Sequence, residues 1–309
     1  MIIDNLKILR RKIFRIIKKI LGFSDKSPFL LEYFIYDWHL RAGHWFYKKK
    51  FSAQDVVREM QKMGMRSGSV VFIQSRWAEF YNCTSTPTEL IEEILKVIGS
   101  DGTMAMDCEP FKREGKIYNV KRTPTYMGLL AEAFRKYPGV KRSCNSRHAA
   151  CAIGAKAEYL ISEHHLGETA WDKKSPYYRL HELNGLLFCF GLGKYYQGTI
   201  QHCIESLLKD EVQYYHDMFD KEKTEYHYID YDGQEKTYWN YDLTKARTSS
   251  YVLTRKITKK YLNGKTSQIS NLEIVCFETK EMLETLLALA RKGIDTYYIP
   301  SKKGYKFEK

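Results

Sequence analysis

The sequence predicts an α/β protein in which a mostly parallel central sheet is flanked by helices, as in an α/β sandwich. The main evidence is an alternation of short apolar runs with amphipathic stretches, joined by glycine-rich turns. The strand Ser69–Gln74, the helix Thr86–Val97 with Pro87 in its first turn and the strand Thr103–Met106 form one such unit. At 309 residues, 44% hydrophobic and 28% charged, the chain has the composition of a globular protein with a full core.

Residues 1–22 form a segment of their own, predicted as a basic amphipathic helix. Isoleucine and leucine recur at three- and four-residue steps, lysine and arginine stand between them, and Gly22 ends the pattern. The charges interrupt the apolar stretch, which excludes a secretory signal peptide. Two interpretations stay open: the helix lies on an anionic membrane surface, or its apolar face docks on protein.

Residues 23–51 are predicted to be a connecting segment, and residues 52–309 the main domain. Serine, proline and aromatic residues are frequent in the connecting segment, and Trp38 and Trp45 are expected to pack under this segment. The domain begins at Ser52, which with Asp55 resembles a helix capping box.

The remaining elements follow from the same periodicities. Residues 207–265 are rich in tyrosine and charge and alternate in places, which predicts antiparallel strands and loops beside the core. The other expected elements are the helices Met127–Tyr137, Ala155–Ser162 and Glu281–Arg291 and the strands Leu186–Leu192 and Asn271–Phe277.

The net charge of +13 indicates a negatively charged partner, such as phosphates, nucleic acid or a membrane surface. Basic and aromatic residues follow no RNA-binding signature, so we expect no nucleic-acid partner. The seven cysteines form no C-x-x-C pair, and several lie in apolar runs, as reduced, buried thiols do. We therefore expect a cytoplasmic protein, which the first helix would place at the inner face of the membrane if it binds lipid.

His148 is the first candidate for chemistry. It precedes the small and apolar run Ala149–Ile153, which should be buried. A partly desolvated imidazole at the end of a buried strand suits a general base. The alternative is a core histidine whose hydrogen bonds are satisfied.

A second candidate stretch is Gly198–Glu205, which reads G-T-I-Q-H-C-I-E. His202 and Glu205 stand three residues apart, on one face of a helix. No third ligand lies nearby in sequence, so we expect no metal. The glycine spacing does not match a dinucleotide fingerprint, and the chain has neither a P-loop nor a G-x-S-x-G motif.

Over roughly residues 52–298 the chain resembles the aminoglycoside 3-N-acetyltransferase family, also called antibiotic N-acetyltransferases. Each matching piece is short, but the pieces come in the family's order and with its spacing. They are Gly64–Gly68, Gly99–Thr103, Thr123–Gly128, Pro138–Ser143, His148, Ser175–Leu180, Gly185–Gly193 and Thr199–Glu205.

The resemblance implies an α/β sandwich, acetyl-CoA as donor and transfer to an amino group on a sugar-like ring. His148 matches the family's active-site histidine, and Glu205 matches the glutamate that pairs with it. The chain departs from the family at Asn145-Ser146, at Ala149 and at Gln74-Ser75-Arg76. These departures leave the His/Glu pair intact.

The resemblance also implies which residues contact the cofactor. Ser75 and Arg76 end the first strand, where backbone N–H groups are candidate oxyanion donors. The residues expected on the CoA side are Thr123, Thr125, Met127 and Arg142.

We expect the acceptor to be an amino sugar, and favour surface-glycan synthesis over antibiotic resistance because a polycationic drug needs an acidic cleft. A local acidic patch in the expected acceptor wall, residues 207–250, would reverse that preference; its members would be Asp217, Asp220, Glu222 and Glu225. An inactive CoA- or sugar-binding homologue and an O-acyltransferase remain alternatives, and homodimerisation stays open.

Overall fold

The computed structural model describes residues 30–111, 115–244 and 247–308. The predicted helix over residues 1–22 lies outside these residues. Contacts divide the chain into two units, Met1–Lys49 and Lys50–Lys309. In the first unit the structure shows helix α2, Leu30–Phe46, within the segment predicted to connect the first helix to the main domain. Trp38 and Trp45 on this helix are 65% and 79% exposed.

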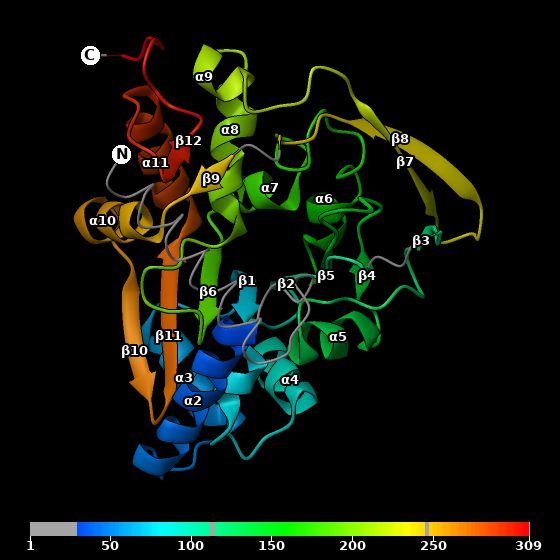
Figure 1. The fold of residues 1–309 in the computed structure, drawn as a ribbon. Coiled ribbons are helices and arrows are strands. Elements are labelled where there is room, and N and C mark those ends of the chain that lie inside the picture. The colour runs from blue at the N-terminus through cyan, green and yellow to red at the C-terminus, as the bar shows by residue number, and fades with distance from the viewer. Residues whose placement is uncertain (1–29, 112–114, 245–246, 309) are drawn as a thin grey trace. The chain divides into compact units, whose positions relative to one another are not determined.

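The second unit is built on a seven-stranded sheet with the order β10-β11-β6-β1-β2-β5-β4 (Figure 1). The α/β class with a helix-flanked central sheet is confirmed. The sheet is not mostly parallel as predicted, because only β6, β1 and β2 are parallel neighbours and the outer pairings are antiparallel. The strands are β1 (Val70–Ser75), β2 (Thr103–Asp107), β4 (Lys141–Arg142), β5 (Ala150–Gly154), β6 (Leu186–Phe190), β10 (Lys265–Ile269) and β11 (Leu272–Glu278).

One face of the sheet is covered by α3 (Ala53–Lys62), α4 (Pro87–Ile98) and α5 (Leu129–Lys136). The first two helices begin where the sequence predicts. Ser52 and Thr86 each form a capping box, in which the hydroxyl accepts the N–H three residues on and that residue's carboxylate accepts the cap N–H. The first residues of these helices are therefore fixed by local hydrogen bonds.

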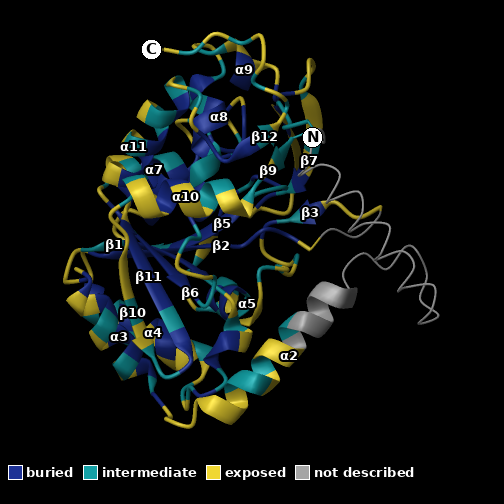
Figure 2. Ribbon diagram, turned by 60° about the vertical axis from the view of Figure 1, so that its left-hand side comes forward, coloured by how far each residue is buried: buried dark blue, intermediate teal, exposed yellow. Residues whose placement is uncertain are grey.

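Helices α6 (Ala157–Ile161), α7 (Pro176–Glu182), α8 (Cys203–Leu208) and α11 (Thr279–Arg291) cover the other face. Figure 2 shows the inner strands β1, β2, β6 and β11 as mostly buried. Neighbouring residues of β1 divide between the two cores: Phe72 faces the α7–α8 layer, and Val71 and Ile73 face the α3–α4 layer. This burial on both faces explains why these strands are apolar throughout and do not alternate.

The region 207–265 combines strands with helices that the sequence analysis missed. Strands β7 (Thr224–Ile229) and β8 (Glu235–Asn240) form the antiparallel hairpin that the alternation predicts, and β3 (Tyr118–Asn119) pairs with β7. Strand β9 (Thr248–Ser249) pairs instead with β12 (Tyr297–Ile299). Helices α9 (Gln213–His216) and α10 (Tyr251–Tyr261) correct the expectation of strands and loops alone.

Two 3-10 helices, η1 (Trp77–Phe80) and η2 (Thr199–His202), follow β1 and precede α8. Among the described residues, no helix has both the length and the apolar character needed to cross a bilayer.

Candidate active site

Two acidic residues stand at the carboxyl end of β2. Asp107 is buried and accepts hydrogen bonds from the Tyr177 hydroxyl at 2.7 Å, the Thr199 hydroxyl at 3.1 Å and the Gln74 amide. Burial and the nearby charge of Glu109 raise the pKa of Asp107 to about 6, against these hydrogen bonds. Because β1 and β2 are parallel neighbours, Gln74 near the end of β1 meets Asp107 at the same edge of the sheet.

Glu109, two residues further on, contacts the predicted base. Its Oε1 lies 3.1 Å from Nδ1 of His148, and its other oxygen accepts a hydrogen bond from the Tyr126 hydroxyl. The backbone N–H of His148 donates to the side-chain oxygen of the buried Asn145 at 2.9 Å. Asn145, one of the departures from the family pattern, therefore fixes the turn that presents the histidine.

The contact with Glu109 determines which nitrogen of the His148 imidazole carries the hydrogen. A carboxylate can only accept, so Nδ1 of His148 must carry the proton, and Nε2 keeps the lone pair that a base requires. Burial lowers the pKa of His148 below its usual value, although the hydrogen bond and charge of Glu109 raise it. The ring is therefore neutral at pH 7, which is the basic form.

Trp171 lies between two histidines. Its ring centroid is 4.3 Å from that of His148 and 5.2 Å from that of His202. The indole thus separates the imidazole bound to Glu109 from a second cluster of charged residues around His202.

Glu205 belongs to this second cluster. It is fully buried, and its Oε1 lies 3.3 Å from His202 Nδ1 and 2.6 Å from Nη1 of Arg247 and accepts the Tyr297 hydroxyl. Burial raises the pKa of Glu205, but the hydrogen bond with His202 and the charges of His202 and Arg247 outweigh it and hold the pKa below its usual value. The resemblance implies that Glu205 pairs with His148; in the structure, the carboxylate at His148 is that of Glu109.

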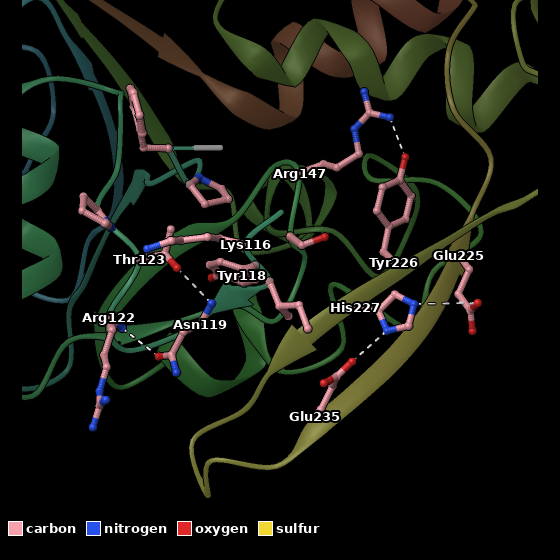
Figure 3. Close-up of a pocket in the computed structure, with 15 residues that line it drawn as sticks. Lys116, Tyr118, Asn119, Arg122, Thr123, Arg147, Glu225, Tyr226, His227 and Glu235 are labelled. Atoms are coloured by element: carbon pink, nitrogen blue, oxygen red, sulfur yellow. Dashed lines mark hydrogen bonds and ion pairs between the residues drawn. The ribbon is translucent and has the colours of Figure 1, made fainter. Parts of the chain in front are cut away.

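Arg147 stands between two cavities. The first, which we call the histidine cavity, has a volume of about 140 Å³ and is lined by Arg147, His148, Trp171 and Arg247, among others. The second, the loop–hairpin cavity, measures about 810 Å³ and lies between residues 110–111 and 116–124 on one side and the β7–β8 hairpin on the other (Figure 3). Arg147 is fixed at their boundary by Asp242 at 2.6 Å and the Tyr226 hydroxyl at 2.6 Å.

The residues expected on the CoA side are spread around this region. Thr123 lines the loop–hairpin cavity. Thr125 donates its hydroxyl to the carbonyl of Glu109, and its own oxygen accepts the N–H of Met127, so both residues stabilise the turn before α5. Arg142 is 3% exposed. Its guanidinium donates to the carbonyls of Cys108 and Thr123, so it acts within the protein interior.

The end of β1 does not offer the expected oxyanion donor at Arg76, because its backbone N–H donates to the carbonyl of Phe190 at 3.0 Å. Ser75 pairs with Phe190 as the last residue of the strand. Neither residue lines the histidine cavity.

Sequence reasoning missed Asp107, Glu109, Trp171 and Arg247. The two acids had a readable signal, since charged side chains directly after a buried strand gather at the carboxyl edge of a parallel sheet. Trp171 and Arg247 lie in irregular segments far apart in sequence, and no local pattern marks them.

Among curated proteins, the chain is similar to aminoglycoside N(3)-acetyltransferase IV of Salmonella sp, with 29% identity over 161 residues, 50% of this chain and 59% of the relative. It is also similar to the SPbeta prophage-derived aminoglycoside N(3')-acetyltransferase-like protein YokD of Bacillus subtilis (strain 168), with 24% identity over 41% of this chain and 55% of the relative. The match thus spans little more than half the length of these relatives.

Solved structures share the fold. AAC-IIIb, in a structure described as binary with CoASH, has a TM-score of 0.68 at 16% identity, covering 80% of this chain and 99% of that one. AAC-VIa bound to sisomicin has a TM-score of 0.64 at 16% identity, covering 78% and 98%.

The model of the aminoglycoside 3-N-acetyltransferase family matches residues 72–290, which include β2, the His148 turn and α8. The chain belongs to the aminoglycoside 3-N-acetyltransferase family.

Proposed function

We propose that the protein is an acetyl-CoA-dependent N-acetyltransferase that acts on the amino group of an amino sugar, with His148 as general base. The observation that carries the proposal is the 3.1 Å contact between His148 Nδ1 and Glu109 on the wall of the histidine cavity. Family membership and the shared fold of the CoASH-bound AAC-IIIb support acetyl-CoA as the donor.

The chemistry needs one base. The acceptor amine must lose a proton to attack the thioester carbonyl, and Nε2 of His148 would take it while Glu109 stabilises the imidazolium that forms. The new C–N bond replaces the C–S bond, and the proton then passes from His148 to the departing thiolate. A thiol with a pKa of about 8.5 is a good leaving group, so no stronger activation is required.

In this proposal Glu205 positions another residue and does not act on the substrate. It is separated from His148 by Trp171, and its charge is balanced by Arg247, which also lines the histidine cavity. It would hold Arg247 in the cavity wall and would not take the proton.

The charges around the cavities favour an acceptor with few positive charges. Two members of the anticipated acidic patch, Asp217 and Glu225, already contact other side chains. Asp217 accepts from the Tyr305 hydroxyl at 2.7 Å and from Gln213 at 2.6 Å, and Glu225 lies 3.8 Å from His227. Arg147 and Arg247 line the histidine cavity itself, together with Asp242, which pairs with Arg147. A drug with several ammonium groups would face these guanidinium groups, whereas a singly aminated sugar would not.

The test is a comparison of acceptors in an acetyl-CoA assay that measures released thiol. Nucleotide-linked amino sugars should reach a kcat/KM above about 10⁴ M⁻¹s⁻¹, the lower end for enzymes with their own substrates. If a gentamicin- or kanamycin-type acceptor alone reaches that value, the acceptor assignment is wrong. If no amine releases thiol faster than buffer does, the protein is an inactive homologue and the proposed function fails.

A further inference from the structure

The loop–hairpin cavity is about 810 Å³, several times the histidine cavity, and the mechanism above assigns nothing to it. Both cavities share Arg147, the residue directly before His148. A ligand bound in the larger cavity would therefore lie next to the residue that precedes the base. Its volume is within the range of about 300–1,000 Å³ typical of small-molecule sites.

The loop wall of this cavity carries positive charge without a counter-ion. Lys116 extends along the wall, and Arg122 reaches outward at its rim (Figure 3). Within the described parts of the chain, neither side chain takes part in an ion pair, unlike Arg147, which is bound to Asp242. Two uncompensated cations at the mouth of a cavity favour an anionic ligand such as a phosphate.

Apolar surface accompanies these charges. Phe111 is 50% exposed, and it lines the cavity together with Tyr118 and Tyr226. An aromatic residue left exposed in a cavity offers a flat surface on which a planar base can stack. A bare amino sugar would make no use of it.

The hairpin wall differs from the loop wall. His227 projects from β7 between Glu225 and Glu235, with Nδ1 3.0 Å from Glu235 and Nε2 3.8 Å from Glu225 (Figure 3). Carboxylates repel phosphates but accept hydrogen bonds from ribose hydroxyls, as in dinucleotide sites. The loop wall thus suits the phosphates of a nucleotide, and the hairpin wall suits its ribose.

From this arrangement we infer that the loop–hairpin cavity binds a nucleoside diphosphate, with its phosphates at Lys116 and Arg122. This inference rests on the proposed function, because the nucleotide would be part of one of the two substrates of that reaction. The nucleotide is either the carrier of the amino sugar or the ADP portion of CoA.

The experiment is calorimetric titration of the full chain with UDP, dTDP and, separately, CoA. The variant Lys116→Ala/Arg122→Ala removes both cations. The control Lys136→Ala/Lys141→Ala makes the same change in charge at two exposed lysines outside the cavity, paired with Glu132 and Glu158. Loss of a charge-assisted phosphate contact should weaken binding about tenfold or more, and the control should change it less than twofold.

The outcomes distinguish whether the bound nucleotide belongs to the acceptor or to CoA. Weaker binding of UDP or dTDP with unchanged CoA affinity assigns the cavity to the acceptor's nucleotide, and weaker binding of CoA alone assigns it to the donor. If all three dissociation constants stay within twofold of the control, the inference is wrong.

The thiol-release assay keeps this result distinct from the proposed function. Acetyl transfer with no effect of the cavity variant would overturn only the nucleotide site. Nucleotide binding that depends on Lys116 and Arg122, in a protein that transfers no acetyl group, would overturn only the enzymatic assignment.

Discussion

Replacing Glu109 with glutamine tests which carboxylate serves His148. Glutamine keeps the size of the side chain and can accept the Nδ1–H, but it removes the negative charge 3.1 Å from the imidazole. A hydrogen bond to a charged group contributes about 1.5–3 kcal/mol. Because that contribution is largest when the ring is protonated in the transition state, kcat should fall about 10- to 150-fold.

The pH dependence of kcat/KM gives a second, independent test with the Glu109→Gln variant. The basic form of His148 is needed, so kcat/KM should rise with pH through its pKa, which burial holds below the usual value, and then level off. The hydrogen bond and charge of Glu109 raise that pKa, so Glu109→Gln should move the acid limb to lower pH. The assay is thiol release from pH 4.5 to 8.5 with one amine acceptor.

Glu205→Gln is the matched comparison. It should leave the acid limb in place and lower stability, because the charge of Arg247 loses its buried counter-ion. We expect a loss of about 2 kcal/mol, or roughly 4–8 °C in Tm. An acid limb that shifts in Glu205→Gln and not in Glu109→Gln would refute the pairing seen in the structure.

Three other predictions concern residues outside the His148 contact. Arg142→Met should cost about 2–4 kcal/mol by leaving the buried carbonyl of Cys108 and the part-buried carbonyl of Thr123 unpaired, yet keep the CoA affinity of the folded protein; a tenfold loss of affinity at unchanged Tm would restore Arg142 to the cofactor site. Because the pKa of Asp107 is raised to about 6 on folding, its charge destabilises the native state as pH rises from 4 to 6, by about 3 kcal/mol at most. Asp107→Asn should therefore gain stability relative to wild type over that range in urea titrations, and a pH-independent difference would contradict this. If residues 1–22 bind membrane, the full chain should sediment with anionic vesicles at low salt while a chain beginning at Ser24 stays in solution; equal partitioning would favour docking on protein.

The sequence predicted most of the elements around the site because their signals are local. Ser52 and Thr86 fix helix starts by capping boxes, and the apolar runs of β1, β2 and β6 mark strands buried on both faces. Helix α10 was missed because its polar, half-exposed sequence resembles the alternating hairpin before it. Helix α2 was missed because its aromatic residues give no clear amphipathic pattern.

The site was predicted less completely because its contacts are formed between distant segments. His148 could be found from its place before a buried strand, but its carboxylate partner comes from the end of β2, 39 residues earlier in the chain. Glu205 was correctly expected beside a histidine of its own helix turn, His202. Which of two buried carboxylates faces a given imidazole depends on side-chain packing around Trp171, which no spacing in the sequence encodes.

The central claim is that His148 is the general base of an acetyl transfer, and turnover of His148→Ala tests it most directly. With acetyl-CoA and the best amine acceptor, kcat should fall about 10²- to 10⁴-fold, while the Tm and the CoA dissociation constant stay near those of wild type. Turnover within threefold of wild type, in a variant that is folded and binds CoA equally well, would contradict the account.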